Sequence, residues 1–445
     1  MAIIQNLYLF SWKDFQDDCQ NLGDLERLKL VIETIPDQEL VQILQKLRAN
    51  GRNDYPIQAI WNSVLAGIVF QHVSIESLRR ELSRNAQLRE MCGFNPLAGV
   101  YAVPSKSAYN RFILKLLAHE SEVRRMFNLL VEELRCIVPD FGINLAGDGK
   151  ALHSLGNPPK KKDGDRRRDE DADWGKKTYK GVDKEGKAWE KVKSWFGFRV
   201  HLIVEADAEL PVAYKVTKAS TGESPVMDQL FAELQEAHPE LLARCDHAMF
   251  DRGYDSADRI CELWGKYGIK PIIGIRNMWK DGEKTRLLRR KTIKNITYDY
   301  EGTVFCHCPK TGEIRQMVYS GFEKTRGSLK YTCPAAAYGI ECKGASQCPI
   351  YKKSIRIPME EDHRIFTPVA RSSYKWKALY DKRTSVERVN SRIDGSFGFE
   401  RHYIRGLAKM QLRCGLALTV MLAIAVGRLH QEHPELMRSL VKTAA

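Results

Sequence analysis

The chain has 445 residues, 43% of them hydrophobic, which is enough for two or three domains with ordinary cores and excludes wholesale disorder. Its formal net charge is +14 and its sequence pI about 9.2. That balance favours a polyanionic partner, most commonly nucleic acid, over the alternative of a basic protein without one.

Residues 1–138 are predicted to form a helical domain, because apolar residues recur at steps of three and four. Ser74 stands where an N-cap is expected before one of these helices. Basic residues on short helices with tight turns fit a helix-turn-helix-like DNA reader, but they fit a plain helical bundle with a solvated basic face equally well. The residues concerned are Arg79, Arg80, Arg84, Lys106, Arg111 and Lys115.

Residues 139–275 are predicted to form the first part of an α/β core. A short apolar run ends in Asp148, and a polar stretch of mixed charge, 158–191, is expected to be a mobile loop. Two runs that alternate with a period of two follow as a hairpin. A helix, a strand that ends in Asp251, a second helix and a last strand complete the order β, ββ, α, β, α, β.

Residues 276–374 interrupt this order with short strands and a cysteine-rich stretch that is poor in apolar residues. Four thiolates can hold a structural Zn²⁺, which would help such a module to fold. The spacing is not that of two C-x2-C pairs, so a set of small buried cysteines is the alternative. The candidate ligands are Cys306, Cys308, Cys333, Cys342 and Cys348, with His307 or His363 in reserve.

Residues 375–445 return to a helical pattern and are predicted to complete the core. The stretch "KALYDKRTSVERVNSRID" begins it, and a helical period places five of its polar side chains on one stripe. The stripe consists of Tyr380, Arg383, Glu387, Asn390 and Asp394.

The apolar run from Cys414 to Val426 is shorter than the ~20 residues that a membrane-spanning helix needs, so it is predicted to be a buried core helix. No secretory signal is visible, because acids and Trp12 precede any long apolar run. We therefore expect a cytoplasmic protein with no membrane partner, whose 11 cysteines are reduced.

Asp148 and Asp251 each end a strand-like run, where a carboxylate faces the cleft above an α/β sheet. Either alone is ordinarily a turn-forming residue. Glu387 adds a third acid, and three converging carboxylates cannot all be ionised cheaply without a cation. Mg²⁺ or Mn²⁺ suits such oxygen ligands, and a pair of these ions supports phosphoryl transfer.

The segments "LAGDGKAL", "MFDRGYDS" and "YDKRTSVERVNSRI" resemble the three acidic motifs of the DDE transposases of bacterial insertion sequences. The resemblance implies a ribonuclease-H-like mixed sheet core with an all-helical N-terminal domain and a small inserted β and cysteine-rich module. It implies Asp148, Asp251 and Glu387 as the catalytic triad and as the ligands of Mg²⁺ or Mn²⁺. It also implies that the helical domain binds the ends of the element.

The stripe departs from the related motif at Asp394, where a lysine that holds a DNA phosphate is expected seven residues after the glutamate. Arg392 or Arg388 is the candidate to replace that lysine. Tyr380 and Arg383 fit DNA phosphate contacts, with ion pairing on the helix surface as the alternative. Lys150 fits a contact with the cleaved strand, and a solvated lysine is as good an interpretation.

These features predict a DNA transposase that binds terminal inverted repeats and target DNA as a homodimer, hydrolyses a phosphodiester bond and carries out strand transfer. The alternative enzyme is a ribonuclease-H-like DNA nuclease without strand transfer. A non-catalytic DNA-binding regulator and a zinc-dependent interaction protein are the alternatives from other classes.

Overall fold

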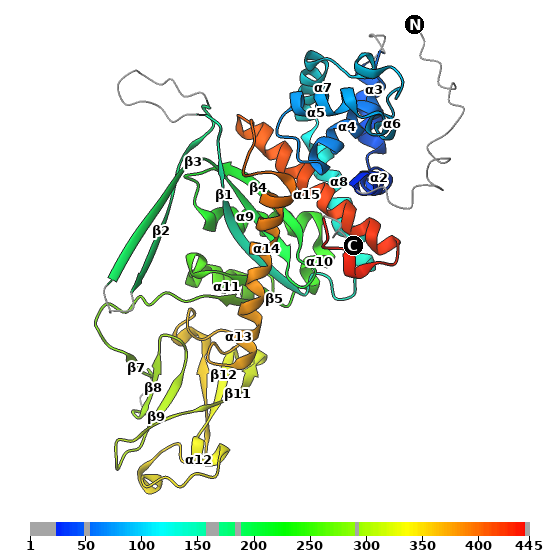
Figure 1. Cartoon of the computed structure of the whole chain (residues 1–445). Coiled ribbons are helices and arrows are strands. Elements are labelled where there is room, and N and C mark those ends of the chain that lie inside the picture. The colour runs from blue at the N-terminus through cyan, green and yellow to red at the C-terminus, as the bar shows by residue number, and fades with distance from the viewer. Residues whose placement is uncertain (1–23, 49–53, 157–168, 183–187, 290–292, 441–445) are drawn as a thin grey trace, which may run out of the picture.

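The computed structural model describes residues 24–48, 54–156, 169–182, 188–289 and 293–440 (Figure 1). Its N-terminal part is helical, as the sequence predicts, and Ser74 caps a helix by accepting a hydrogen bond from the Ser77 backbone N–H at 3.1 Å. The helices are α2 (Asp24–Thr34), α3 (Gln38–Lys46), α4 (Ile57–Val69), α5 (Ile75–Arg84), α6 (Ala86–Cys92), α7 (Lys106–Ala118) and α8 (Glu120–Ile137).

A mixed sheet forms the centre of the molecule, with strand order β4-β3-β1-β5-β6 and β2 as a further partner of β3. The β3–β4 and β3–β1 pairs are antiparallel, whereas β1, β5 and β6 run parallel. The strands are β1 (Asn144–His153), β2 (Asp173–Val182), β3 (Ala188–Glu205), β4 (Leu210–Lys218), β5 (His247–Phe250) and β6 (Lys270–Ile273). This mixed α/β core with a helical N-terminal region confirms the predicted fold class.

The prediction that residues 158–191 form a loop is wrong in part. Residues 157–168 and 183–187 lie outside the described residues, but β2 and the start of β3 are paired strands (Figure 1). The composition of this stretch is misleading, because lysines and acids hide the spaced aromatic residues, among them Trp174 and Trp189, that favour strands.

Helices pack on both faces of the sheet. α9 (Glu223–Ala237) contacts β1, β3 and β4, and α14 (Ser385–Phe397) contacts β1 and β3. α13 (Tyr374–Asp381) contacts β5 and β6, while α11 (Ala257–Gly265) contacts β6. The short helix α10 (Pro239–Arg244) follows α9.

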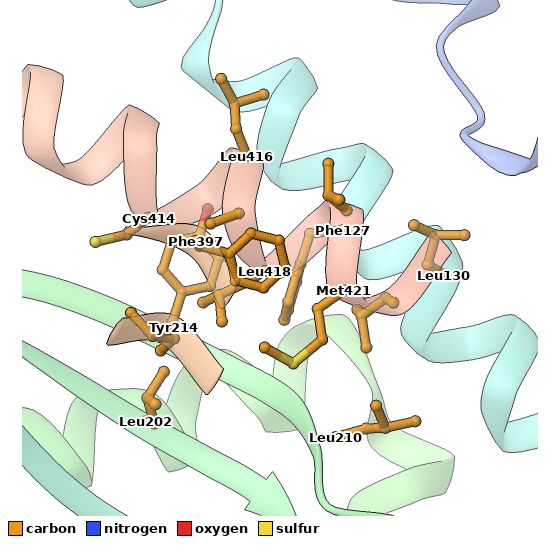
Figure 2. Packing of buried hydrophobic residues seen from close by; sticks show 14 of the residues in the cluster. Phe127, Leu130, Leu202, Leu210, Tyr214, Phe397, Cys414, Leu416, Leu418 and Met421 are labelled. Carbon is orange, nitrogen blue, oxygen red and sulfur yellow. The ribbon is translucent and has the colours of Figure 1, made fainter. Parts of the chain in front are cut away.

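One hydrophobic core joins the N-terminal helices to the sheet through α15 (Leu407–His430), which packs against α2, α8 and β4. Figure 2 shows α8, α15 and the strands meeting there through Phe127, Leu130, Leu202, Leu210, Tyr214, Phe397, Cys414, Leu416, Leu418 and Met421. Among the described helices, α15 is long and apolar enough to cross a membrane, but 89% of its most apolar window is buried. The prediction of a buried core helix is therefore confirmed.

A second, separate hydrophobic cluster lies within residues 288–370. Its sheets have the orders β10-β9-β8-β7 and β11-β12-β13. The elements are β7 (Thr285–Leu287), β8 (Ile296–Asp299), β9 (Val304–His307), β10 (Ile314–Gln316), β11 (Val318–Glu323), β12 (Ser328–Thr332), α12 (Pro334–Ala337) and β13 (Ser354–Pro358). The short strands that the sequence predicts here are present.

Candidate active site

Asp148 lies in the middle of β1 with its Oδ1 atom buried, and within the described parts of the chain this atom has no hydrogen-bond partner. Burial raises the pKa of Asp148 from 3.8 to about 6. Burial is the largest cause of this raised pKa; the nearby charges of Asp251 and Glu223 act in the same direction, and Lys177 opposes them. A buried carboxylate oxygen without a partner is costly, so this position has a reason other than stability.

Asp251 directly follows β5 and lies beside Asp148. The parallel register pairs Gly147 of β1 with Phe250 of β5. Asp148 and Asp251 are the next residues on these two adjacent strands. Its Oδ1 atom accepts a hydrogen bond from the Gly253 backbone N–H at 2.7 Å, which caps a short 3-10 helix, Arg252–Tyr254. The two acids therefore lie side by side on adjacent parallel strands, although only Asp251 is at a strand end and β1 continues past Asp148 to His153.

Glu387 lies in the first turn of α14, and its side chain is 54% exposed. Arg383 donates to its Oε1 atom at 2.8 Å. A cavity of about 480 Å³ separates α14 from β1 and brings Glu387 to face Asp148. Its lining consists of Asp148, Lys150, Glu387, Asn390, Ser391, Asp394, Gly395 and Glu400.

The predicted polar stripe is divided. A 3-10 turn, Lys382–Thr384, separates α13 from α14. Tyr380 stacks on Trp376 with ring centroids 4.8 Å apart, and the Arg383 guanidinium lies 5.6 Å from the Tyr380 ring. Neither Tyr380 nor Arg383 lines the cavity, whereas the later stripe residues Asn390 and Asp394 do.

Asp394 binds the ammonium group of Lys150, which reaches it from β1 across the cavity. Period-two alternation places Lys150 on the same face of β1 as Asp148. The related motif has a lysine where this chain has Asp394. Here Lys150, which is 244 positions earlier in the sequence, places its ammonium group beside Asp394 instead.

Arg388 and Arg392, the candidates to replace the expected lysine, are both bound within the protein, and a DNA contact by Arg392 stays a prediction. Both bind Glu209 in the turn between β3 and β4, and neither lines the cavity. Burial lowers the pKa of Arg392 to about 10, while the carboxylate of Glu209 opposes that shift. Arg392 therefore stabilises the packing of α14 on the sheet.

Sequence reasoning missed three charged residues near the site, namely Glu223, Arg199 and Lys177. Glu223 begins α9 and forms an ion pair with Arg199 at 3.0 Å. A Cβ atom at Gly149 would lie 3.0 Å from the Glu223 side chain, so glycine makes room for this acid. Burial raises the pKa of Glu223, and Lys177 opposes the shift. An acid at the start of a helix is too common a signal to identify Glu223 from the sequence.

The five candidate zinc ligands lie near one another within residues 306–348. Cys306 lies in β9, and burial raises its pKa to about 11, with the Cys333, Cys348 and Cys342 thiols nearby. Cys308 follows β9, and hydrogen bonds from Thr311 lower its pKa to about 7. These thiols are free. Zinc binding stays a prediction.

The three candidate acids resemble the candidate zinc ligands in their arrangement. Within the parts of the chain that the structure describes, no three His, Cys, Asp or Glu side chains are arranged so that they could hold a metal ion. Two of the three candidate acids already have partners, because Arg383 donates to Glu387 and the Gly253 backbone N–H donates to Asp251.

The profile of the transposase DDE domain family matches residues 164–423, more than half of the chain. The chain belongs to this family of transposases. The match includes Asp251 and Glu387, while Asp148 precedes it. A solved piggyBac transposase synaptic complex with hairpin DNA is 13% identical to the transposase described here, at a TM-score of 0.36, covering 95% of this chain and 80% of that one. No curated protein matches the chain.

Transposases of this family generally use a divalent metal ion. The donor set here suits a hard cation, because the acids offer oxygen ligands and Oδ1 of Asp148 lacks a hydrogen-bond partner in the described structure. The neighbouring carboxylates that raise the pKa of Asp148 describe a crowded anionic site, which a bound cation would neutralise.

Proposed function

We propose that this transposase cleaves DNA at the ends of its element and joins them to target DNA, with Asp148, Asp251 and Glu387 as the catalytic acids. The observation that carries the proposal is the buried, unpartnered Oδ1 atom of Asp148 in the cavity that Glu387 lines. Asp251 supports it from the adjacent strand end, where its charge acts on Asp148.

Mg²⁺ or Mn²⁺ bound by the three acids would activate the attacking oxygen and stabilise the leaving oxygen. The side chains around the acids position the DNA. Lys150 contacts a phosphate at the cleaved strand, and Asp394 orients its ammonium group. Tyr380 in α13 and Arg383 in the 3-10 turn before α14 can contact the flanking phosphates once Arg383 releases Glu387.

The reaction has two displacements at phosphorus. In the first, a water oxygen forms a bond to the phosphorus at the element's end, the bond to the 3′ oxygen breaks, and a 3′-hydroxyl is released. In the second, that hydroxyl attacks a phosphorus of the target DNA and displaces another 3′ oxygen, so the number of phosphodiester bonds is conserved. Neither step needs a covalent bond to the protein.

The proposal includes the remaining sequence predictions about partners and domains. The helical domain up to residue 138 binds the terminal inverted repeats, and its exposed Arg80, Lys106 and Arg111 are available for phosphate contacts. Arg79 and Arg84 are instead paired with Glu76 and Glu81. Because two ends must be held together, the active form is a homodimer on DNA, in the nucleoid of the cytoplasm.

Single substitutions of the acids test the proposal on a duplex that carries the DNA flanking the gene. Asp148→Asn, Asp251→Asn and Glu387→Gln should each reduce Mg²⁺-dependent cleavage by at least ~10³-fold and leave DNA binding unchanged. Asp258→Asn, at an exposed acid of α11, is the control and should cleave normally. Mg²⁺ should raise the melting temperature of the unmodified protein but not of Asp148→Asn.

Retained cleavage in any of the three variants would overturn the assignment of that acid. Cleavage without joined products in a strand-transfer assay would favour the nuclease alternative. Binding without any cleavage by the unmodified protein would favour the regulator.

A further inference from the structure

A two-stranded ribbon projects from the sheet beside the active site (Figure 1). It consists of β2 and residues 188–196 of β3, which pair only with each other among the described strands. From Gly197 onward β3 pairs with β1, so the ribbon continues directly into the strand pair that holds Asp148. A two-stranded ribbon alone is marginally stable in water, which raises the question of what it contacts.

One face of the ribbon collects lysines. The register places Lys177 directly opposite Lys193, and period-two alternation adds Lys191 and Trp189 to the same face. We name these four residues the lysine face. Lys191 and Lys193 are exposed, and Trp189 is 46% exposed.

The other face of the ribbon is mixed. It carries Lys176, Glu190 and Val192, with Val192 54% exposed and Trp174 packed against Phe196 with ring centroids 5.8 Å apart. The register also pairs Lys180 with Glu190 on this side. The four residues of the lysine face thus include no acid, whereas the other face carries lysines together with Glu190.

The lysine face is adjacent to the acidic site at its base. Lys177 acts electrostatically on Asp148 and on Glu223, which places its ammonium group near both carboxyls. Trp195 lies on the same face, nearer the sheet. Its indole ring packs against Gly175, and a side chain at position 175 would collide with that ring. The lysines thus form a cationic path that ends at the catalytic acids.

Protection of an exposed edge is the ordinary explanation for lysines on such a strand. It does not explain why Lys177, Lys191 and Lys193 share one face, and it does not explain the direct opposition of Lys177 and Lys193. A polyanion is the partner that these charges fit.

We propose that the lysine face binds the phosphate backbone of duplex DNA next to the cleaved strand, with Trp189 packing against the sugars or bases. The inference rests on the proposed function, because it takes DNA as the substrate. It adds a contact surface that belongs neither to the helical domain nor to the catalytic cavity, and it assigns a partner to the ribbon.

Salt-dependent binding of the full-length protein to a fluorescent duplex of mixed sequence tests the proposal. Each phosphate contact contributes about 0.9 to the slope of log affinity against log salt. The double variant Lys191→Ala/Lys193→Ala should therefore lower that slope by about 1.8 and bind more weakly. Lys176→Ala, an exposed lysine on the opposite face, is the matched control and should retain the normal slope. Unchanged circular dichroism and melting temperature would show that the variants fold.

An unchanged slope in the double variant would overturn the proposal, as would an equal per-lysine loss in Lys176→Ala, which would indicate a general charge effect. The cleavage assay keeps the two proposals separate. If the acid variants lose cleavage while the double variant binds normally, the catalytic assignment stands and the ribbon contact falls. If the unmodified protein does not bind the duplex, both fall.

Discussion

The two walls of the cavity present their carboxylates in opposite ways. β1 holds Asp148 in a fixed, buried position with its Oδ1 atom unpartnered in the described structure, whereas α14 presents Glu387 exposed and bound to Arg383. The sheet therefore fixes one acid at a cost in stability, while the helix holds the other in a resting ion pair. We infer that DNA and metal assemble the site mainly by moving Glu387 from Arg383.

The largest expected effect is a change in the free energy of unfolding when Asp148, on the β1 wall, is substituted. The folded-state pKa of Asp148, about 6, lies above its ordinary value of 3.8. The folded state is thus favoured when this carboxyl is protonated, and that contribution is lost as the pH rises through about 6. In EDTA, Asp148→Asn should therefore stabilise the protein by up to about 3 kcal/mol near pH 8 and by progressively less as the pH falls towards 5. Urea unfolding at several pH values measures this, and a pH-independent difference would show that burial does not control Asp148.

A smaller effect is expected where the walls touch, at the ion pair of Lys150 and Asp394. Loss of one charged hydrogen bond to phosphate costs about 1.5–3 kcal/mol, so Lys150→Ala should reduce cleavage by roughly 10- to 150-fold. Asp394→Ala should cost less than about 10-fold, because the lysine remains. Single-turnover cleavage rates compare the two. Equal losses would mean that the pair serves only to hold α14 on β1.

The smallest effect is expected on the helix wall. Glu387→Gln removes a single i,i+4 ion pair to an exposed carboxylate, so the free energy of unfolding should fall by no more than about 0.5 kcal/mol at low salt and less at high salt. Urea unfolding in the presence of EDTA checks this. A loss above about 1 kcal/mol would show that Glu387 has a structural role, and the contrast with Asp148 would disappear.

Local sequence patterns predict those features that depend on one short segment of the chain. An acid after an apolar run singled out Asp148 and Asp251, and the order of strands and helices followed from local patterns. Asp251 does follow the end of β5, but β1 continues past Asp148 to His153. The helical period also identified Glu387, although it did not reveal the 3-10 turn before it.

Features that depend on distant segments could not be predicted in this way. The pairing of Lys150 with Asp394 joins residues far apart in sequence, and Glu223 approaches the site only because α9 packs over Gly149. The ribbon was missed because a strand rich in lysine lacks the apolar alternation that identifies a half-buried strand.

The position of α15 has a consequence for the synthesis of the protein. This helix completes the core of the N-terminal helices, and Arg428 pairs with Glu26 at 3.1 Å while Arg27 donates to the carbonyl of Leu440. Contacts between segments so far apart slow folding. A growing chain cannot bury the apolar faces of its first helices until nearly all of it has left the ribosome. Assembly of the N-terminal helices is therefore coupled to synthesis of the last helix, and a chain terminated before α15 lacks the element that completes their core.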